Sequence, residues 1–229
     1  MHSFIDALQF IGDNLHFMLT KTVEHLELSG AAIGVAIVIA IPLGVVLGHL
    51  HRGSFLAINA SNIGRALPSL AIISIGIGIL GIGFVNVMFA LVVLAVPPML
   101  TNAYVAVDGV DRDAVEAAQA AGMSPLQVLW KVEIPLAVGL MFAGIRTGAV
   151  YVVATATLGA LAGGGGLGDV IVNQASYGTA GVIAGALAVT ALAFFVEGVF
   201  AVVQRLLTPK ALRHEEGPAE LLAPVIEGT

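Results

Sequence analysis

The side chains that could perform covalent chemistry do not form a catalytic set in this sequence. The chain has no cysteine, which excludes a thiol nucleophile, a disulfide and a thiolate metal site. His49 and His51 stand two residues apart, where helical side chains point away from each other, and no third metal ligand is evident. No Ser, His and Asp set can be assembled for hydrolysis. We therefore expect no catalytic residue and no bound metal.

Two glycine-rich segments, residues 76–81 and 163–168, match the Gly-x-Gly-x-x-Gly pattern of dinucleotide-binding loops. Neither has the strand, helix and downstream acidic residue that such a loop requires, and no P-loop motif occurs in the chain. The chain by itself is therefore expected to bind no nucleotide cofactor. The second run instead predicts a bend, followed by a short amphipathic helix through Leu167, Val170, Ile171 and Gln174; a flexible turn is the alternative.

Arg146 and Glu197 are charged residues inside long apolar runs. An unpaired charge there costs several kcal/mol, of the order of 3, unless the side chain reaches the interface. At 1.5 Å per helical residue, Arg146 lies about 16 Å from Pro135 and Glu197 about 15 Å from Leu207. Because these depths match, we expect the two to pair or to share a polar network. The alternative is that each reaches the interface or backbone carbonyls separately.

The elements that carry these residues are predicted to be membrane helices. Of the 229 residues, 58% are hydrophobic and 10% charged, against about 45–50% and 25% in soluble domains. The net charge of -6 argues against a nucleic-acid partner. A span needs about 20 apolar residues. The runs predict an all-α polytopic protein with five spans: one in 28–51, two in 66–107 divided near 78–83, one in 134–168 and one in 170–196.

The first 20 residues are expected to form an N-terminal amphipathic segment at the membrane surface, because apolar residues recur at helical spacing. These residues are Phe4, Leu8, Ile11 and Leu15. Glu24 and His25 are interpreted as part of the solvated edge of the first span.

Basic residues predict the orientation, since Lys and Arg are retained on the cytoplasmic side. They follow the first, third and fifth expected spans, all on one side: Arg52, Arg112, Lys131, Arg205, Lys210 and Arg213. The N-terminus is therefore expected outside and the C-terminus in the cytoplasm. The membrane domain is expected over residues 21–207, and the acidic tail, residues 208–229, is expected to be disordered.

The longest polar interlude between spans, residues 108–136, is expected to form two short helices in the cytoplasm. Asp113 is expected to cap the first helix together with Glu116, and Gly122 permits its C-terminal turn. Ser124 followed by Pro125 predicts the start of the second. An alanine-rich helix offers a low profile that another protein's groove can enclose. The alternative is a helical hairpin that merely covers the ends of the spans.

This loop resembles the EAA motif of bacterial ATP-binding cassette (ABC) import permeases. Glu116-Ala117-Ala118, then Gly122, then Val132-Glu133-Ile134-Pro135 match Glu-Ala-Ala, three residues, Gly, nine residues and Ile-x-Leu-Pro, with Val132 and Ile134 as mild departures. The resemblance continues through residues 66–84, 95–104, 143–150 and 155–171. From about residue 26 to 207 the chain resembles the permease subunit of the osmoprotectant branch, which imports glycine betaine, choline and carnitine.

The resemblance implies a type I importer with a methionine-permease-like fold in the bacterial inner membrane. The loop would be the coupling helix, with Glu116, Ala117, Ala118, Gly122 and Pro135 as the residues that couple it to the ATPase. It also implies a separate pair of ATPase subunits that carry ATP and Mg, a second permease subunit, identical or related, and an extracytoplasmic substrate-binding protein. This chain itself would bind no cofactor and catalyse no reaction.

The solute path is the least specified part of the sequence. Candidate lining residues are polar positions at plausible depth: Asn62, Ser69, Tyr104, Thr155 and Thr157. The chain has three tyrosines, so it is expected to bind quaternary ammonium groups weakly, because such groups are commonly held over aromatic faces. The EAA motif reports coupling and not cargo, so a permease for amino acids or another small solute is an alternative. An ion-coupled secondary carrier with Arg146 and Glu197 as its relay is another.

Overall fold

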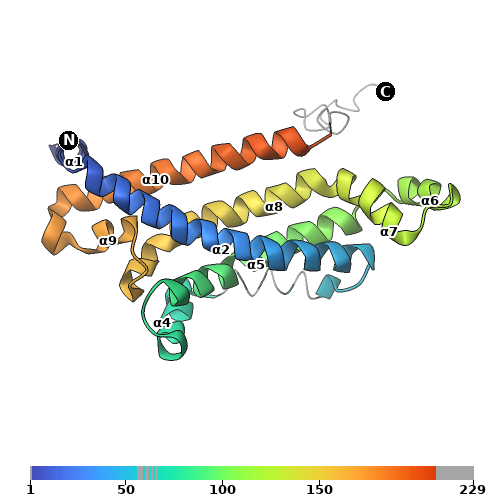
Figure 1. Ribbon diagram of the computed structural model, residues 1–229, viewed down its shortest axis with the longest axis horizontal. Coiled ribbons are helices and arrows are strands. Elements are labelled where there is room, and N and C mark those ends of the chain that lie inside the picture. The colour runs from blue at the N-terminus through green and yellow to red at the C-terminus, as the bar shows by residue number, and fades with distance from the viewer. Residues whose placement is uncertain (1, 56–58, 60–61, 63, 65–66, 210–229) are drawn as a thin grey trace, which may run out of the picture.

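Helices make up all the regular structure of the described residues in the computed structural model (Figure 1). The structure describes residues 2–55, 59, 62, 64 and 67–209. Beyond residue 209, the expected disordered tail lies outside the described residues. The helices are α1 (His2–Asp13), α2 (Leu15–His49), α4 (Ser69–Leu80), α5 (Phe84–Asp108), α6 (Arg112–Ala120), α7 (Pro125–Val128), α8 (Ile134–Thr155), α9 (Leu167–Val172) and α10 (Gln174–Leu207). A π-helical turn, η1 (Leu129–Glu133), joins α7 to α8, and a 3-10 segment, η2 (Ala156–Ala162), follows α8.

Four helical stretches of the described residues are long and apolar enough to cross a membrane: α2, α5, the run Pro125–Ala162 and α10. The sequence predicted five. The predicted second span corresponds to α4, which has 12 residues and is therefore about 18 Å long, shorter than the roughly 30 Å hydrocarbon core. The predicted division near 78–83 is confirmed, since α4 ends at Leu80 and α5 begins at Phe84.

Small residues allow the long helices to pack closely. A Cβ added to Gly44 of α2 would lie 2.6 Å from the Cβ of Ala103 and 2.8 Å from the carbonyl oxygen of Leu100, both in α5. A Cβ added to Gly144 of α8 would clash with the Cβ of Asn102 in α5. These glycines belong to Gly-x-x-x-Gly pairs, a pattern that permits close helix contact in membranes. The structure uses both pairs inside this one chain, where they join α2 and α8 to α5.

The N-terminal segment forms two helices rather than one surface segment of 20 residues. Helix α1 ends at Asp13, and α2 begins at Leu15 and runs without a break through the expected first span. Helix α1 packs against α10, where the rings of Phe10 and Tyr177 meet edge to face with centroids 6.3 Å apart. Ala7 is fully buried in this contact region, whereas Phe4 and Leu8 are exposed.

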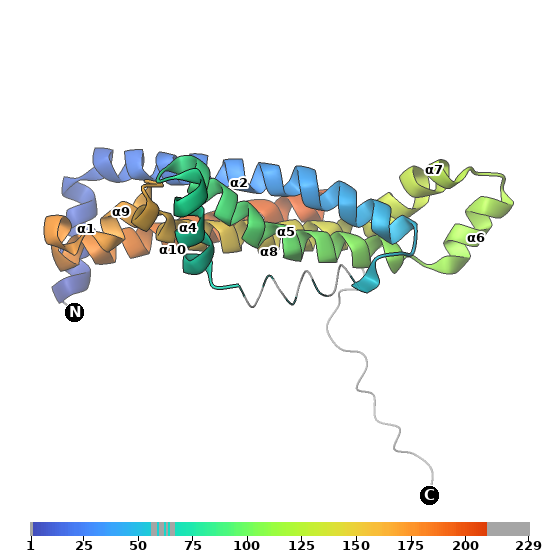
Figure 2. The ribbon, with the colours of Figure 1, turned by 90° about the horizontal axis from the view of Figure 1, so that it is seen from below.

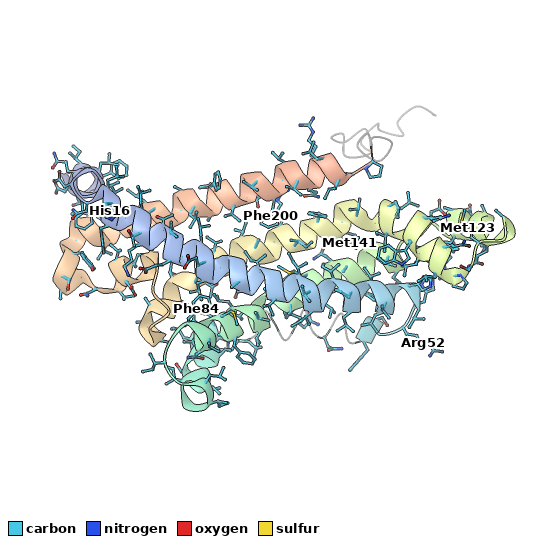
Figure 3. The ribbon with its side chains drawn as sticks, in the orientation of Figure 1. His16, Arg52, Phe84, Met123, Met141 and Phe200 are labelled. Carbon is cyan, nitrogen blue, oxygen red and sulfur yellow. The ribbon has the colours of Figure 1, made fainter. Side chains whose placement is uncertain are left out.

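The two ends of the bundle differ. Figure 2 shows α1 and α9 at the end that holds the N-terminus, and α6 and α7 projecting past the ends of α2 and α5 at the other. Figure 3 places Arg52 and Met123 at the α6 end and His16 at the opposite end. The basic residues that follow the first and third expected spans thus gather at one end of the molecule.

Candidate functional site

Helix α6 begins two residues before the position expected from its sequence. Its N-cap is Asp111, whose carboxylate accepts a hydrogen bond from the backbone N–H of Asp113 at 2.9 Å. The prediction that Asp113 is the cap is therefore wrong, because the earlier aspartate satisfies a free N–H of the first turn. The predicted turn at Gly122 is confirmed, since its φ of 84° lies in the left-handed region that favours glycine.

The second loop helix starts as predicted but does not end within the loop. Ser124 and Gln127 form a capping box, in which the Ser124 hydroxyl accepts from the Gln127 N–H and the Gln127 side chain accepts from the Ser124 N–H. Helix α7 then continues through η1 into α8, with Pro135 in the first turn of α8. Helix α6 packs against α7 and η1, which are continuous with the membrane-length helix, so it is linked to that helix through the turn at residues 121–124 and through these contacts.

The expected coupling residues fall into an exposed set and a packed set. Glu116, Ala117 and Gly122 are exposed, together with the neighbouring alanines of α6. Ala118 is buried on the opposite side of the helix, and Pro135 is half-buried in α8. The structure thus presents the first three at the projecting end of the molecule and uses the other two for packing. We call the exposed residues Glu116, Ala117, Ala120 and Ala121 the α6 face.

Behind α6 lies a groove of about 260 Å³ that joins the loop to the bundle. Val115, Glu116 and Gln119 of α6 line it, together with Val107 of α5 and Glu133 of η1. Glu116 therefore faces both solvent and this groove, and a movement of α6 would change the groove directly.

Two histidine–carboxylate contacts fasten the helix ends near this groove. Nδ1 of His49 lies 2.6 Å from Oε2 of Glu133, whose side chain is buried. Nδ1 of His51 lies 2.8 Å from Oδ1 of Asp108. The first contact ties the end of α2 to η1 and the second ties the following turn to the end of α5. The sequence analysis, which found no metal site at the two histidines, missed both carboxylate partners because they lie far away in the chain.

The structure brings Arg146 and Glu197 together. Nε of Arg146 donates to Oε1 of Glu197 at 2.6 Å, and Nη1 donates to Oε1 of Gln204 at 3.2 Å. The Gln204 side chain in turn donates to the backbone carbonyl of Gly139 at 3.0 Å. Sequence reasoning missed Gln204, although it lies seven residues, about two turns, after Glu197 on the same helix. The network fastens α10 to α8.

A second polar cluster holds the glycine run at the opposite end. Nζ of Lys21 lies 2.8 Å from carboxylate oxygens of both Glu24 and Asp169, and Glu24 also accepts from the backbone N–H of Gly166 at 3.0 Å. The predicted bend and the short helix after it, α9, are confirmed, but α9 ends at Val172 and the predicted member Gln174 begins α10 instead. The interpretation of His25 as a solvated edge residue is wrong: it is fully buried, and its Nε2 donates to the carbonyl of Val153 at 2.9 Å.

The candidate path residues do not form one site. Asn62 is exposed, and Ser69 begins α4. Tyr104 and Thr155 are buried in the packing of α5 and α8, and the Thr157 hydroxyl donates to the carbonyl of Ala154. A pocket of about 550 Å³ instead lies between α5 and α8. None of the five candidates lines it; among its lining residues are Pro97, Pro98, Thr101, Asn102, Thr147 and Tyr151.

Known proteins with related sequences are membrane transport subunits. Residues 28–210 match the family model described as "Binding-protein-dependent transport system inner membrane component". The choline transport system permease protein OpuBB of Bacillus subtilis (strain 168) is 40% identical over 215 residues, which cover 93% of this chain and 98% of the relative. The glycine betaine/carnitine/choline transport system permease protein OpuCB of the same organism is 40% identical over 207 residues, covering 90% and 95%. The carnitine transport permease protein OpuCB of Listeria monocytogenes is 38% identical over 212 residues, covering 92% and 97%.

A solved structure has the same fold. An inward-facing structure of the MetNI methionine ABC transporter includes a chain that superimposes with a TM-score of 0.73 at 22% identity, over 85% of this chain and 98% of that chain. The predicted all-helical, methionine-permease-like fold is confirmed by this match.

Proposed function

This chain belongs to the family of binding-protein-dependent transport system inner membrane components, and we propose from that premise that its solutes are quaternary-amine osmoprotectants. The chain is the permease subunit of an ABC importer, a multi-pass inner-membrane protein without catalytic activity of its own. The solutes would be of the glycine betaine, choline and carnitine type. Support comes from relatives that are named for these solutes and match over nearly their whole length.

The partners follow from the family and from the shape of the molecule. A pair of ATPase subunits, which carry ATP and Mg, would bind the α6 face in the cytoplasm. A second permease subunit, identical or related, would complete the path, because four or five helices hardly enclose one. A binding protein would deliver solute at the end that holds α1 and α9. The N-terminus would then be outside and the C-terminus in the cytoplasm.

The observation that carries this proposal is the exposed α6 face at the projecting end, where α6 packs against α7 and η1 and these continue into α8. When ATP closes the ATPase pair, α6 moves with it. The movement passes through α7 and η1 into α8, and through Glu133 and His49 to the end of α2. Access to the path then switches between the two sides of the membrane.

Two alternatives from the sequence are weaker. A permease for amino acids shares the fold, but the likeness to the methionine transporter at 22% identity concerns the fold alone. An ion-coupled carrier would need Arg146 and Glu197 to exchange ions, whereas in the structure they bond to each other and Arg146 also bonds to Gln204. The family membership also argues against a carrier that works without an ATPase.

The test combines docking and solute choice. Ala117→Trp places a bulky ring on the α6 face, and we expect it to abolish co-purification of the ATPase while the unfolding temperature stays unchanged. Ala186→Trp, at an exposed alanine of α10, is the control and should retain the ATPase. In the unchanged complex with binding protein, glycine betaine, choline or carnitine should stimulate ATP hydrolysis and methionine should not. Stimulation by methionine alone would overturn the solute assignment, and normal ATPase binding by Ala117→Trp would overturn the docking site.

A further inference from the structure

The α5 wall of the pocket between α5 and α8 includes a residue, Leu94, whose backbone carbonyl lacks both of its usual helical donors. Pro97 and Pro98 are adjacent near the middle of α5, and proline has no backbone N–H. The carbonyl of Leu94 would accept from residue 98 in an α-helix and from residue 97 in a 3-10 turn, so both of its usual donors are missing. The carbonyl of Val93 loses its donor at residue 97 for the same reason. Leu94, Pro97 and Pro98 all line the pocket.

A carbonyl without a donor is costly inside a membrane unless another partner satisfies it. A cation is such a partner, because carbonyl dipoles can replace part of its hydration. The neighbouring carbonyl of Pro98 is already occupied, since the Asn102 side chain donates to it at 2.8 Å. The proline pair thus leaves acceptor capacity at residues 93 and 94, and the second of these lines the pocket between α5 and α8.

The opposite wall of the pocket supplies an aromatic ring. Tyr151 of α8 lines the pocket and is exposed, so packing within this chain does not cover its ring. The Thr147 hydroxyl lies one turn earlier and already donates to the carbonyl of Ala143, which leaves it an acceptor toward the pocket. Among the described residues that line this pocket, none carries a charge. The walls formed by α5 and α8 therefore present a cation with no competing Lys or Arg and no carboxylate that would trap it.

Resting on the proposed function, we infer that this pocket is a weak transit site for the trimethylammonium head of the solute. This head has no N–H to donate, so hydrogen-bond acceptors cannot select it by geometry. It is instead held by aromatic faces and by carbonyl dipoles. The volume of about 550 Å³ exceeds that of a small quaternary amine. The described lining of α5 and α8 holds no carboxylate, and walls without a counter-ion release a cation readily. Passage requires that combination of weak holding and easy release.

The test measures choline binding to the permease–ATPase complex in detergent without the binding protein, by saturation-transfer NMR on the choline methyl protons. Tyr151→Leu removes the ring and should weaken binding about tenfold, whereas Tyr151→Phe should bind like the unchanged chain. Phe195→Leu, at an exposed aromatic of α10, is the matched control and should have no effect. The neutral isostere 3,3-dimethylbutanol should bind more weakly than choline and should not distinguish Tyr151→Phe from Tyr151→Leu.

A second variant acts on the carbonyl and carries no folding risk. Pro98→Ala supplies an N–H to the carbonyl of Leu94 and regularises α5, so the protein should unfold at the same or a higher temperature while choline binding weakens severalfold. Unchanged choline affinity in both Tyr151→Leu and Pro98→Ala, or equal affinity for choline and its neutral isostere, would overturn the site. Uptake of choline by the complete complex with binding protein is measured in parallel. If uptake persists while the pocket binds nothing, the transit site fails alone; if no quaternary amine is taken up or stimulates hydrolysis, the proposed solutes fail instead.

Discussion

At the scale of single residues, the Arg146–Glu197 pair explains how two charges are kept inside an apolar bundle. Each residue alone would have to reach water or a carbonyl from about three helical turns inside the membrane. Together they neutralise each other, and Gln204 takes up a further N–H of the guanidinium. The pair therefore acts as a fastening between α8 and α10, which otherwise meet through small and apolar side chains.

Glu197→Gln should lower the unfolding temperature of the detergent-solubilised chain. The variant leaves the Arg146 charge without a carboxylate, and hydrogen bonds to charged groups contribute about 1.5–3 kcal/mol each. The double variant Arg146→Gln with Glu197→Gln should regain part of this loss, because no charge then remains unpaired. Glu27→Gln, at an exposed glutamate of α2, is the control. Equal unfolding temperatures for Glu197→Gln and the unchanged chain would show that the pair does not fasten the helices.

At the scale of elements, the loop of residues 108–136 illustrates how capping sets a helix boundary. Three aspartates, Asp108, Asp111 and Asp113, lie before α6 or in its first turn, and aspartate is a favoured N-cap residue. Asp111 is the N-cap because its extended ψ of 123° lets its carboxylate accept a hydrogen bond from the N–H of Asp113. Asp113 itself lies in the first turn of the helix. At the other end of α6, Gly122 redirects the chain toward α7 and thereby sets the angle at which the α6 face is presented.

The effect of a substitution at Gly122 should depend on how well the new residue tolerates a positive φ. No heavy atom lies within 4 Å of a Cβ added there, so the penalty comes from its φ of 84° alone. Asparagine adopts this left-handed backbone conformation readily, whereas a β-branched residue destabilises it by about 1–2 kcal/mol. Solute-stimulated ATP hydrolysis should therefore fall in the order glycine, asparagine, valine, while the unfolding temperature of the bundle changes little. Full coupling in Gly122→Val would contradict a role for this turn.

The packing of α2 on α5 makes a second prediction about elements. Gly44→Ala places a Cβ 2.6 Å from that of Ala103 and 2.8 Å from a backbone oxygen, which cannot move aside cheaply. We expect destabilisation of about 1–3 kcal/mol, as for other overpacked contacts, measured by thermal unfolding in detergent. Gly34→Ala on the same helix meets no atom within 4 Å and should be neutral or stabilising by up to about 1 kcal/mol. Similar effects of the two variants would mean that α2 and α5 are not in close contact.

At the scale of the whole molecule, a polar cluster lies at each end of the bundle, in addition to the Arg146–Glu197 pair within it. Lys21, Glu24 and Asp169 hold one end, and the two histidine–carboxylate contacts hold the other. Between them, α5 is packed by both α2 and α8, so it forms the centre of the described bundle. A movement applied at the α6 end can therefore reach the opposite end through α8 and α5.

Cysteine labelling tests the proposed orientation of this molecule. The chain has no native cysteine, so single variants need no altered background. His16→Cys and Gln119→Cys place exposed thiols at the two ends seen in Figure 3, on α2 and α6. A membrane-impermeant maleimide should label His16→Cys in cells with a permeable outer layer but an intact inner membrane, and Gln119→Cys only after that membrane is opened. The reverse pattern would overturn the orientation with the N-terminus outside.

The sequence predicted turns and helix ends in the loops better than it predicted the residues that line the solute path. Gly122, Ser124 and the glycine run act through local backbone geometry, which neighbouring residues reveal. The path candidates Tyr104 and Thr155 were chosen for polarity and depth, but both are buried in helix packing. Polarity at a given depth does not say which side of a helix faces a cavity. The adjacent prolines of α5 were a usable signal for the pocket, because they remove helical donors, and the sequence interpretation did not use it.

By itself, the sequence determined the helical class, the division between α4 and α5, the projecting loop and the motif that relates the chain to import permeases. These depend on composition, on apolar length and on short-range capping, all of which are properties of contiguous residues. Only the tertiary structure decided which distant residues meet. It brings His49 to Glu133 and Lys21 to Asp169, and it adds Gln204 to the Arg146 network. It also places Tyr151 and the adjacent prolines of α5 around the same cavity. The reason is that each of these contacts joins residues far apart in the chain. Such contacts depend on how each helix is rotated about its axis, and close packing at glycines such as Gly44 and Gly144 fixes that rotation. The helical pattern of the sequence does not determine it.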